Sequence, residues 1–248
     1  MQILLQAKIE PISTTPDINV HLRYSFAPQF LQGSAIFARR AHEIENYNID
    51  AVDEEMRAEH LSCVSSAVIQ CAAALDAEIY DVTHHGPGNH LGSNDLDTTA
   101  RDSLIPFKDE IDKRPTLDSY ERVLSLLQKG PIKGTHIYES ADLLIVLRNE
   151  LAHYKSMWGL DMDSEKRFVI LLSRLRRLKL EKPPFISPEP QTNFFPLICL
   201  SASLASWCVK TSVAYIDEFY ARLNIISRLK PYEKRLTVPS PKKITSGP

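Results

Sequence analysis

The sequence predicts an all-α protein, an antiparallel bundle of four to five long helices. Only 8 of the 248 residues are glycine, and apolar residues recur every three or four positions through several long segments. That spacing places them along one face of an α-helix. Because 44% of the residues are hydrophobic, the chain can also bury a sizeable core. Helices packed on helices are therefore the expected architecture.

The first 50 residues carry the weakest helical signal. Their β-prone stretches are interrupted by Pro11 and Pro16, which favours a short hairpin or an irregular arm. A short helix is expected only from Ser34 to Tyr47. We therefore expect residues 1–50 to form an N-terminal arm, followed by a helical domain over residues 51–228.

Five segments of the remaining chain have the helical spacing. The first runs from Glu54 to Asp81 after an acidic start and stops before the glycine-proline loop that begins at His84. Between the first two helices, residues 83–116 are long and polar, which predicts a mobile excursion. The other four expected helices span residues 117–129, 140–157, 164–180 and 197–226.

The end of the sequence differs in composition. From Pro231 to Pro248 it is rich in proline and lysine and has few apolar residues. Such a segment buries too little apolar surface to offset the entropy lost on ordering. We expect residues 229–248 to form a disordered basic tail that folding does not need.

Cysteine usage and hydropathy indicate a cytoplasmic protein with no membrane segment. No C-x-x-C pair is present, and the cysteines lie in apolar stretches, as buried thiols of a reducing compartment do. The N-terminal stretch has no apolar run long enough for a signal peptide. Residues 191–209 are uncharged, but Pro196 and several serines argue against a spanning helix. The four cysteines are Cys63, Cys71, Cys199 and Cys208.

The charge balance restricts how the chain could bind nucleic acid. With 29 Lys and Arg against 31 Asp and Glu, the net charge is -2, so the whole molecule does not attract RNA. A local basic patch would be needed instead. The candidates are Lys155, Arg174, Arg176 and Arg177, although a solvated helix face accounts for the same residues.

No metal or cofactor site is expected. The histidines and acids that follow the first long helix sit in a glycine-rich loop without the spacing of metal ligands on a helix. Phosphate-binding loops and nucleophile elbows are also missing from the sequence. The loop residues concerned are His84, His85, His90, Asp95 and Asp97.

The expected helix over 140–157 is apolar on two faces. One stripe, which includes Leu143, Leu147 and Leu151, would pack into the core. A second line, about 140° away, consists of Ala141, Ile145 and Ala152. Small residues on a second face suit the close approach of another helix, either within the bundle or from a second copy of the chain.

Polar residues flank this second line in the pattern Arg-Asn-x-x-x-His, formed by Arg148, Asn149 and His153. Asn149 and His153 are neighbours one turn apart, whereas Arg148 lies about 140° around the helix from His153. A two-fold axis along the seam would bring Arg148 of one chain toward His153 of the other. The sequence therefore favours a composite site in a homodimer.

These residue types suit RNA cleavage without a metal, because the 2'-hydroxyl is a nucleophile built into the substrate. His153 can transfer the protons, since its imidazole titrates near neutral pH. Arg148 can bind the non-bridging phosphate oxygens and stabilise the charge of the transition state. Asn149 could orient His153 or the phosphate.

The segment from Leu144 to Tyr154 resembles the signature helix of the HEPN superfamily. The stretch from Ser65 to Ala77, with Leu75 followed by Asp76, is similar to the small-residue helix that precedes the motif in many members. Residues 205–219 resemble a late helix of the same group. The resemblance covers roughly residues 55–227 and implies a HEPN-like helical bundle, usually a homodimer, with Arg148 and His153 as catalytic positions and Asn149 as their polar neighbour.

Two functions follow from the resemblance. The first is a HEPN ribonuclease that acts on RNA in defence or as a toxin, with an antitoxin or another defence protein as partner. The alternative is a catalytically inactive HEPN module that mediates dimerisation or another interaction. Some HEPN toxins carry a modified tyrosine two residues after the histidine, but that position is Lys155 here. Asp76 and Glu78 are interpreted as acids of the helix surface or dimer seam.

Overall fold

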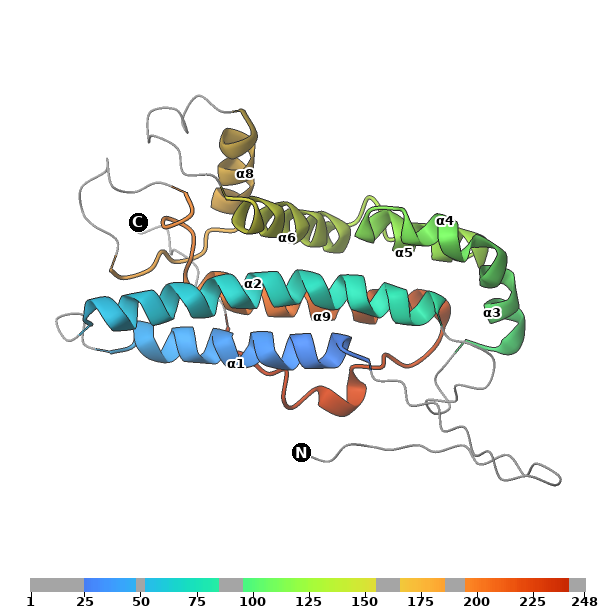
Figure 1. Cartoon of the computed structure of the whole chain (residues 1–248), viewed down its shortest axis with the longest axis horizontal. Helices are drawn as coiled ribbons and strands as arrows, with labels where there is room; N and C mark the ends of the chain where they lie inside the picture. The colour runs from blue at the N-terminus through green and yellow to red at the C-terminus, as the bar shows by residue number, and fades with distance from the viewer. Residues whose placement is uncertain (1–24, 48–51, 85–95, 155–165, 186–194, 241–248) are drawn as a thin grey trace, which may run out of the picture.

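A computed structural model shows an all-α protein, as the sequence predicts (Figure 1). All the elements assigned within the described part of the chain are helices, and they pack around a single apolar core. The β-prone residues of the expected N-terminal arm, and Lys155, lie outside that part. The structure describes residues 25–47, 52–84, 96–154, 166–185 and 195–240.

Three helices form the body of the bundle: α1 (Ala27–Glu45), α2 (Glu54–Thr83) and α9 (Ala202–Leu223). Figure 1 shows α1 running beside α2, with α9 behind them. On the outer edge the Arg40 guanidinium donates to both carboxylate oxygens of Glu59, at 2.7 and 3.1 Å.

The short helix expected from Ser34 to Tyr47 is present as the later part of α1, but its assignment to an N-terminal arm is wrong. The helix begins at Ala27, with Pro28 in its first turn, and it belongs to the core. Its buried face is built largely from Ala35, Ala38 and Ala41, each fully buried. Small side chains let the backbones of α1 and α2 approach closely, which makes α1 an integral part of the bundle.

Helix α2 is the longest element and spans 30 residues. Its N-cap is Asp53, whose carboxylate accepts the Met56 N–H at 2.8 Å. By length and composition α2 could also cross a membrane, but 56% of its apolar window is buried in the bundle. A buried core helix passes the same test, so the apolar character of α2 is explained by its packing.

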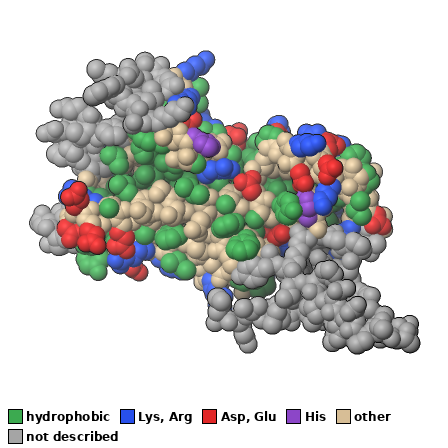
Figure 2. Space-filling view, viewed as in Figure 1, with side chains coloured by type: hydrophobic (Ala, Val, Ile, Leu, Met, Phe, Trp, Pro, Cys, Tyr) green, Lys and Arg blue, Asp and Glu red, His purple; other side chains and the backbone are tan. Residues whose placement is uncertain are grey.

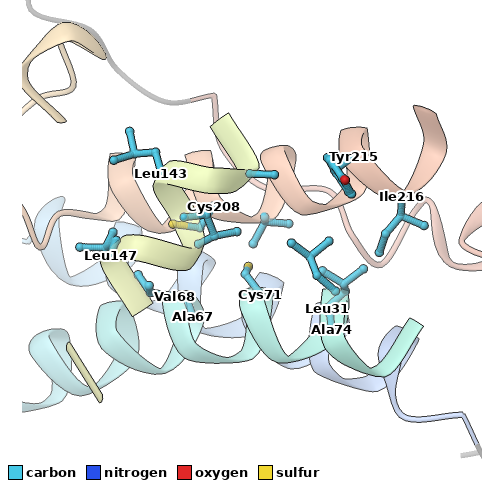
Figure 3. Packing of buried hydrophobic residues seen from close by; sticks show 14 of the residues in the cluster. Leu31, Ala67, Val68, Cys71, Ala74, Leu143, Leu147, Cys208, Tyr215 and Ile216 are labelled. Carbon is cyan, nitrogen blue, oxygen red and sulfur yellow. The ribbon is translucent and has the colours of Figure 1, made fainter. Parts of the chain in front are cut away.

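Helix α6 (His136–Ala152) lies across α2 and α9 and closes the core from the other side. Figure 3 shows Leu143 and Leu147 of α6 directed toward Val68 of α2 and Cys208 of α9. All four side chains are buried. Helices α5 (Thr116–Leu126) and α8 (Lys166–Arg177) extend this second layer at either end of α6.

Residues 98–112 are folded, which corrects the expected excursion over residues 83–116. They form α3 (Thr98–Leu104), a short 3-10 helix (Ile105–Phe107) and α4 (Lys108–Asp112). Leu104 and Ile111 anchor this segment in the core. His84, at the end of α2, contacts Asp112 of α4, with its Nε2 at 3.0 Å from the carboxylate.

The expected disordered tail is also partly folded. Leu236 and Val238 are buried, 7% and 8% exposed, although they are among the few apolar residues of the tail. Arg39 of α1 donates to the backbone carbonyls of Arg235 and Thr237, at 3.2 and 2.8 Å. Residues 231–240 thus pack against the bundle, because two of their side chains are buried and two of their backbone carbonyls accept hydrogen bonds from Arg39.

Glu78 is fully buried rather than a surface acid. The Tyr220 hydroxyl donates to its carboxylate, and Arg228 Nη1 lies 3.4 Å from the same oxygen. Burial raises the pKa of the Glu78 carboxyl, and the positive charge of Arg228 opposes that rise. This cluster ties α2 to α9 and to the segment that follows α9.

The expectation that the cysteines are buried apolar residues holds for three of the four, which lie in the core as free thiols. The fourth, Cys199, is half-buried in the turn before α9.

Candidate functional site

The Arg-Asn-x-x-x-His motif occupies the C-terminal end of α6. The helix begins after Thr135, whose hydroxyl caps the Tyr138 N–H at 3.2 Å, and it ends at Ala152. His153 is the C-cap residue, and its N–H donates to the Asn149 carbonyl at 3.0 Å. The motif therefore stands where α6 stops, with its imidazole just beyond the last helical residue.

Arg148 is held in position by two other helices. One of its terminal nitrogens lies 3.1 Å from the Asp76 carboxylate of α2. The other oxygen of Asp76 accepts the Thr116 hydroxyl from the start of α5. This chain of contacts fixes the guanidinium, because each partner sits on a different helix.

The pair is nevertheless accessible. The Arg148 side chain is 27% exposed and that of Asp76 is 47% exposed. The Nε atom of Arg148 is buried and has no hydrogen-bond partner among the described residues. An ion pair at this exposure contributes about 1 kcal/mol or less to stability, so it does more to orient the guanidinium than to hold the fold together.

Asn149 and His153 are exposed. Within the described residues, no hydrogen bond or ion pair is found for either side chain. Figure 2 shows histidine, basic and acidic side chains close together on the face where α6 lies over α2. One chain thus presents an arginine held by an ion pair and an exposed imidazole, at positions about 140° apart around the helix.

Only part of the apolar line predicted for a dimer seam on α6 lies on the surface. Ala141 is fully buried within its own chain, so it cannot contribute to a dimer interface. The reason is that α6 packs on both α2 and α9, and both of its apolar faces enter the core at its N-terminal half. Ile145 is half-buried and Ala152 is exposed, so the C-terminal part of the line remains on the surface.

The basic residues of α8 divide into two groups. Arg174 donates to the Asp142 carboxylate at 2.7 Å and to the Glu139 carbonyl at 3.2 Å, so it fastens α8 to α6. The Arg174 side chain is still 27% exposed, and its role in RNA binding stays a prediction. Arg176 and Arg177 are exposed, and no ion pair is found for them in the described part of the chain.

The described residues offer no metal centre. They contain no cluster of three or more His, Cys, Asp or Glu side chains with suitable spacing. His84 stacks on the Tyr80 ring at 3.7 Å and contacts Asp112, which accounts for its position. His85, His90 and Asp95, from the loop considered above, lie outside the residues described.

Sequence reasoning missed the contacts that orient Arg148. Asp76 and Arg148 are separated by 72 residues, and Thr116 is a further 40 from Asp76. Their side chains meet only because α2, α5 and α6 pack together, and no local pattern encodes that. The sequence shows that Leu75 is followed by an acid, Asp76, but it does not show that this acid pairs with Arg148.

No protein-family model, curated protein or solved structure matches this chain.

Proposed function

We propose that this chain is a metal-independent endoribonuclease of the HEPN type. The observation that carries the proposal is the guanidinium of Arg148, oriented by Asp76 near the end of α6, with the exposed His153 five residues further along the chain. A cation fixed before the substrate arrives stabilises a phosphorane without reorganisation during the reaction. The exposed imidazole can reach a 2'-hydroxyl or a leaving 5'-oxygen.

In this mechanism the substrate supplies the nucleophile. The 2'-oxygen attacks the adjacent phosphorus, its proton passes to a histidine, and the bond to the 5'-oxygen breaks as that oxygen receives a proton. The products are a 2',3'-cyclic phosphate and a 5'-hydroxyl. Arg148 binds the non-bridging oxygens throughout, and Asn149 orients the phosphate or the imidazole.

The site is completed by a second copy of the chain. The accessible surface beside Arg148 is formed by small or uncharged residues: Ile69 and Ala73 on α2, and Ile145 and Ala152 on α6. Figure 2 shows that this face has few charged side chains along the middle of α2. Pairing of two such faces about a two-fold axis would bring Arg148 of one copy near His153 of the other.

RNA would approach over α8. Arg176 and Arg177 supply exposed positive charge beside α6, where the net charge of the whole chain supplies none. Such an RNA-cleaving site fits a role in defence or as a toxin. A partner protein would then restrain the activity. If the wild-type protein forms dimers but cuts no RNA, the interaction module becomes the better account.

We expect Asp76→Asn to reduce the rate of RNA cleavage by about tenfold or more, because the guanidinium loses the charge that orients it. The measurement is cleavage of a labelled single-stranded RNA, with DNA of the same sequence as the substrate that should survive. Asp142→Asn is the matched control, since it removes the acid that pairs with Arg174 between α6 and α8, a similarly exposed ion pair away from Arg148. Equal rates for Asp76→Asn and the wild type would show that the ion pair does not serve catalysis.

Ala152→Arg should convert the dimer into a monomer and abolish cleavage, because a charged side chain would enter the seam. Light scattering gives the mass, and the RNA assay gives the activity. A mixture of Arg148→Ala and His153→Ala chains should recover part of the activity, since one composite site of each mixed dimer is intact. No recovery, with exchange of subunits demonstrated, would place both residues in a site within one chain.

A further inference from the structure

A cavity lies along α8, lined by residues other than the Arg174 that pairs with α6. It has a volume of about 150 Å³, is open to solvent, and lies between α8 with the residues that follow it and the turn leading into α9. None of the contacts that orient Arg148 involves these residues. The cavity is lined by Leu172, Leu175, Arg176, Lys179, Leu180, Glu181, Lys182, Ile198, Cys199 and Leu204.

The floor of the cavity is aliphatic. Apart from Cys199, its side chains are leucines and one isoleucine, with no aromatic ring and no hydroxyl or amide group. The Cys199 thiol donates to the Pro196 carbonyl at 3.1 Å, and burial raises its pKa to about 12, so it remains a neutral thiol. A nucleobase would leave its polar edge without partners here, and it would find no ring to stack on.

The rim of the cavity is basic. Arg176, Lys179 and Lys182 face a single acid, Glu181, and no ion pair is found for these three cations among the described residues. A flexible acyl chain needs only apolar contact inside, whereas its carboxylate needs positive charge at the mouth. A volume of about 150 Å³ is large enough for an apolar group the size of benzene.

Lys179 stands just beyond the end of α8, on the rim of the cavity. Its φ is 53°, in the left-handed region, and its N–H donates to the Arg176 carbonyl at 3.1 Å where α8 ends. Glycine or asparagine is favoured at such a position, because a longer side chain is strained there. Lys179 adopts this conformation and lines the mouth of the cavity.

From the cavity and its rim we infer that the chain binds the anion of a free medium-chain fatty acid. The end of the acyl chain occupies the floor formed by Leu172, Leu175 and Leu204, and the carboxylate meets Lys179 with Arg176 or Lys182. The site shares Arg176 with the proposed path of RNA over α8, but it does not involve Arg148 or His153 and so does not rest on the proposed ribonuclease.

Titration calorimetry with octanoate, below its micelle concentration, tests the inference on the full chain. We expect one saturable site, and weaker binding by about fivefold or more for octanol and for butyrate, which lack the charge and the chain length respectively. Lys179→Gly should weaken octanoate by about fivefold while thermal stability is kept or raised, because glycine relieves the strained φ. Ile198→Trp, which fills the cavity from a half-buried position, should abolish binding.

Two matched variants act as controls. Gln128→Gly changes the other left-handed residue that ends a helix, at φ 55°, and should leave octanoate binding unchanged. Arg177→Gln removes a neighbouring charge that does not line the cavity and should also have no effect. Equal affinity for octanol and octanoate, or insensitivity to both Lys179→Gly and Ile198→Trp, would overturn the inference. Stronger binding of adenosine monophosphate, or binding only to phosphatidylglycerol vesicles, would also contradict it.

Discussion

His153→Ala is expected to lower the rate of RNA cleavage by about 100-fold or more, the usual scale for losing a general acid or base. The side chain is exposed at the C-cap of α6 and has no described partner, so its removal should leave helical content and the unfolding midpoint unchanged. Circular dichroism and single-turnover cleavage of a labelled RNA measure the two properties. An activity loss without a stability loss identifies a chemical role.

His136→Ala is the matched control for this prediction. His136 is also exposed and lies at the opposite end of the same helix, where the proposed mechanism gives it no part. Its variant should cleave RNA at the wild-type rate. If His153→Ala instead unfolds the protein, the histidine is structural. If both histidine variants retain full activity, another residue transfers the proton.

Removal of residues 231–248 is expected to destabilise the protein strongly. The deletion exposes the surface now covered by Leu236 and Val238, and burial of each such side chain contributes about 1.5–3 kcal/mol. It also leaves the Arg39 guanidinium without its two backbone acceptors. The free energy of unfolding, measured with a chemical denaturant, should fall by about 3 kcal/mol or more.

A shorter deletion separates packing from chain length. Removal of residues 241–248 alone leaves every described contact of the tail in place and should not change the free energy of unfolding. Leu236→Ala should lower the free energy of unfolding by a substantial part of the amount that the longer deletion removes. If the longer deletion is as stable as the full chain, the tail is dispensable, as its composition first suggested.

Hydrophobic periodicity was sufficient to predict the all-α fold and five of the long helices, because large apolar residues repeat along them. It predicts only the later part of α1 and places it in an arm, because the core face of α1 depends on alanines such as Ala35 and Ala38 that carry little hydrophobic signal. The tail was misread for a related reason: two well-placed side chains, Leu236 and Val238, are enough to dock a segment of polar composition.

The candidate site was predictable in part. The motif at Arg148 and His153 can be read directly, because its residues are close in sequence. The ion pair of Arg148 with Asp76 depends on the packing of separate helices and could not be predicted from the sequence. Ala141 was placed on a dimer seam because a periodicity shows that a face is apolar, but not whether the chain's own helices already cover it.

The most direct test of the proposed ribonuclease is to incubate the purified wild-type protein with single-stranded RNA in excess EDTA and to identify the product ends. We predict cleavage with a 2',3'-cyclic phosphate on one product and a 5'-hydroxyl on the other, because the nucleophile belongs to the substrate and the protein supplies only protons and positive charge. Intact RNA under these conditions, with cleavage restored by a divalent metal, would contradict the mechanism.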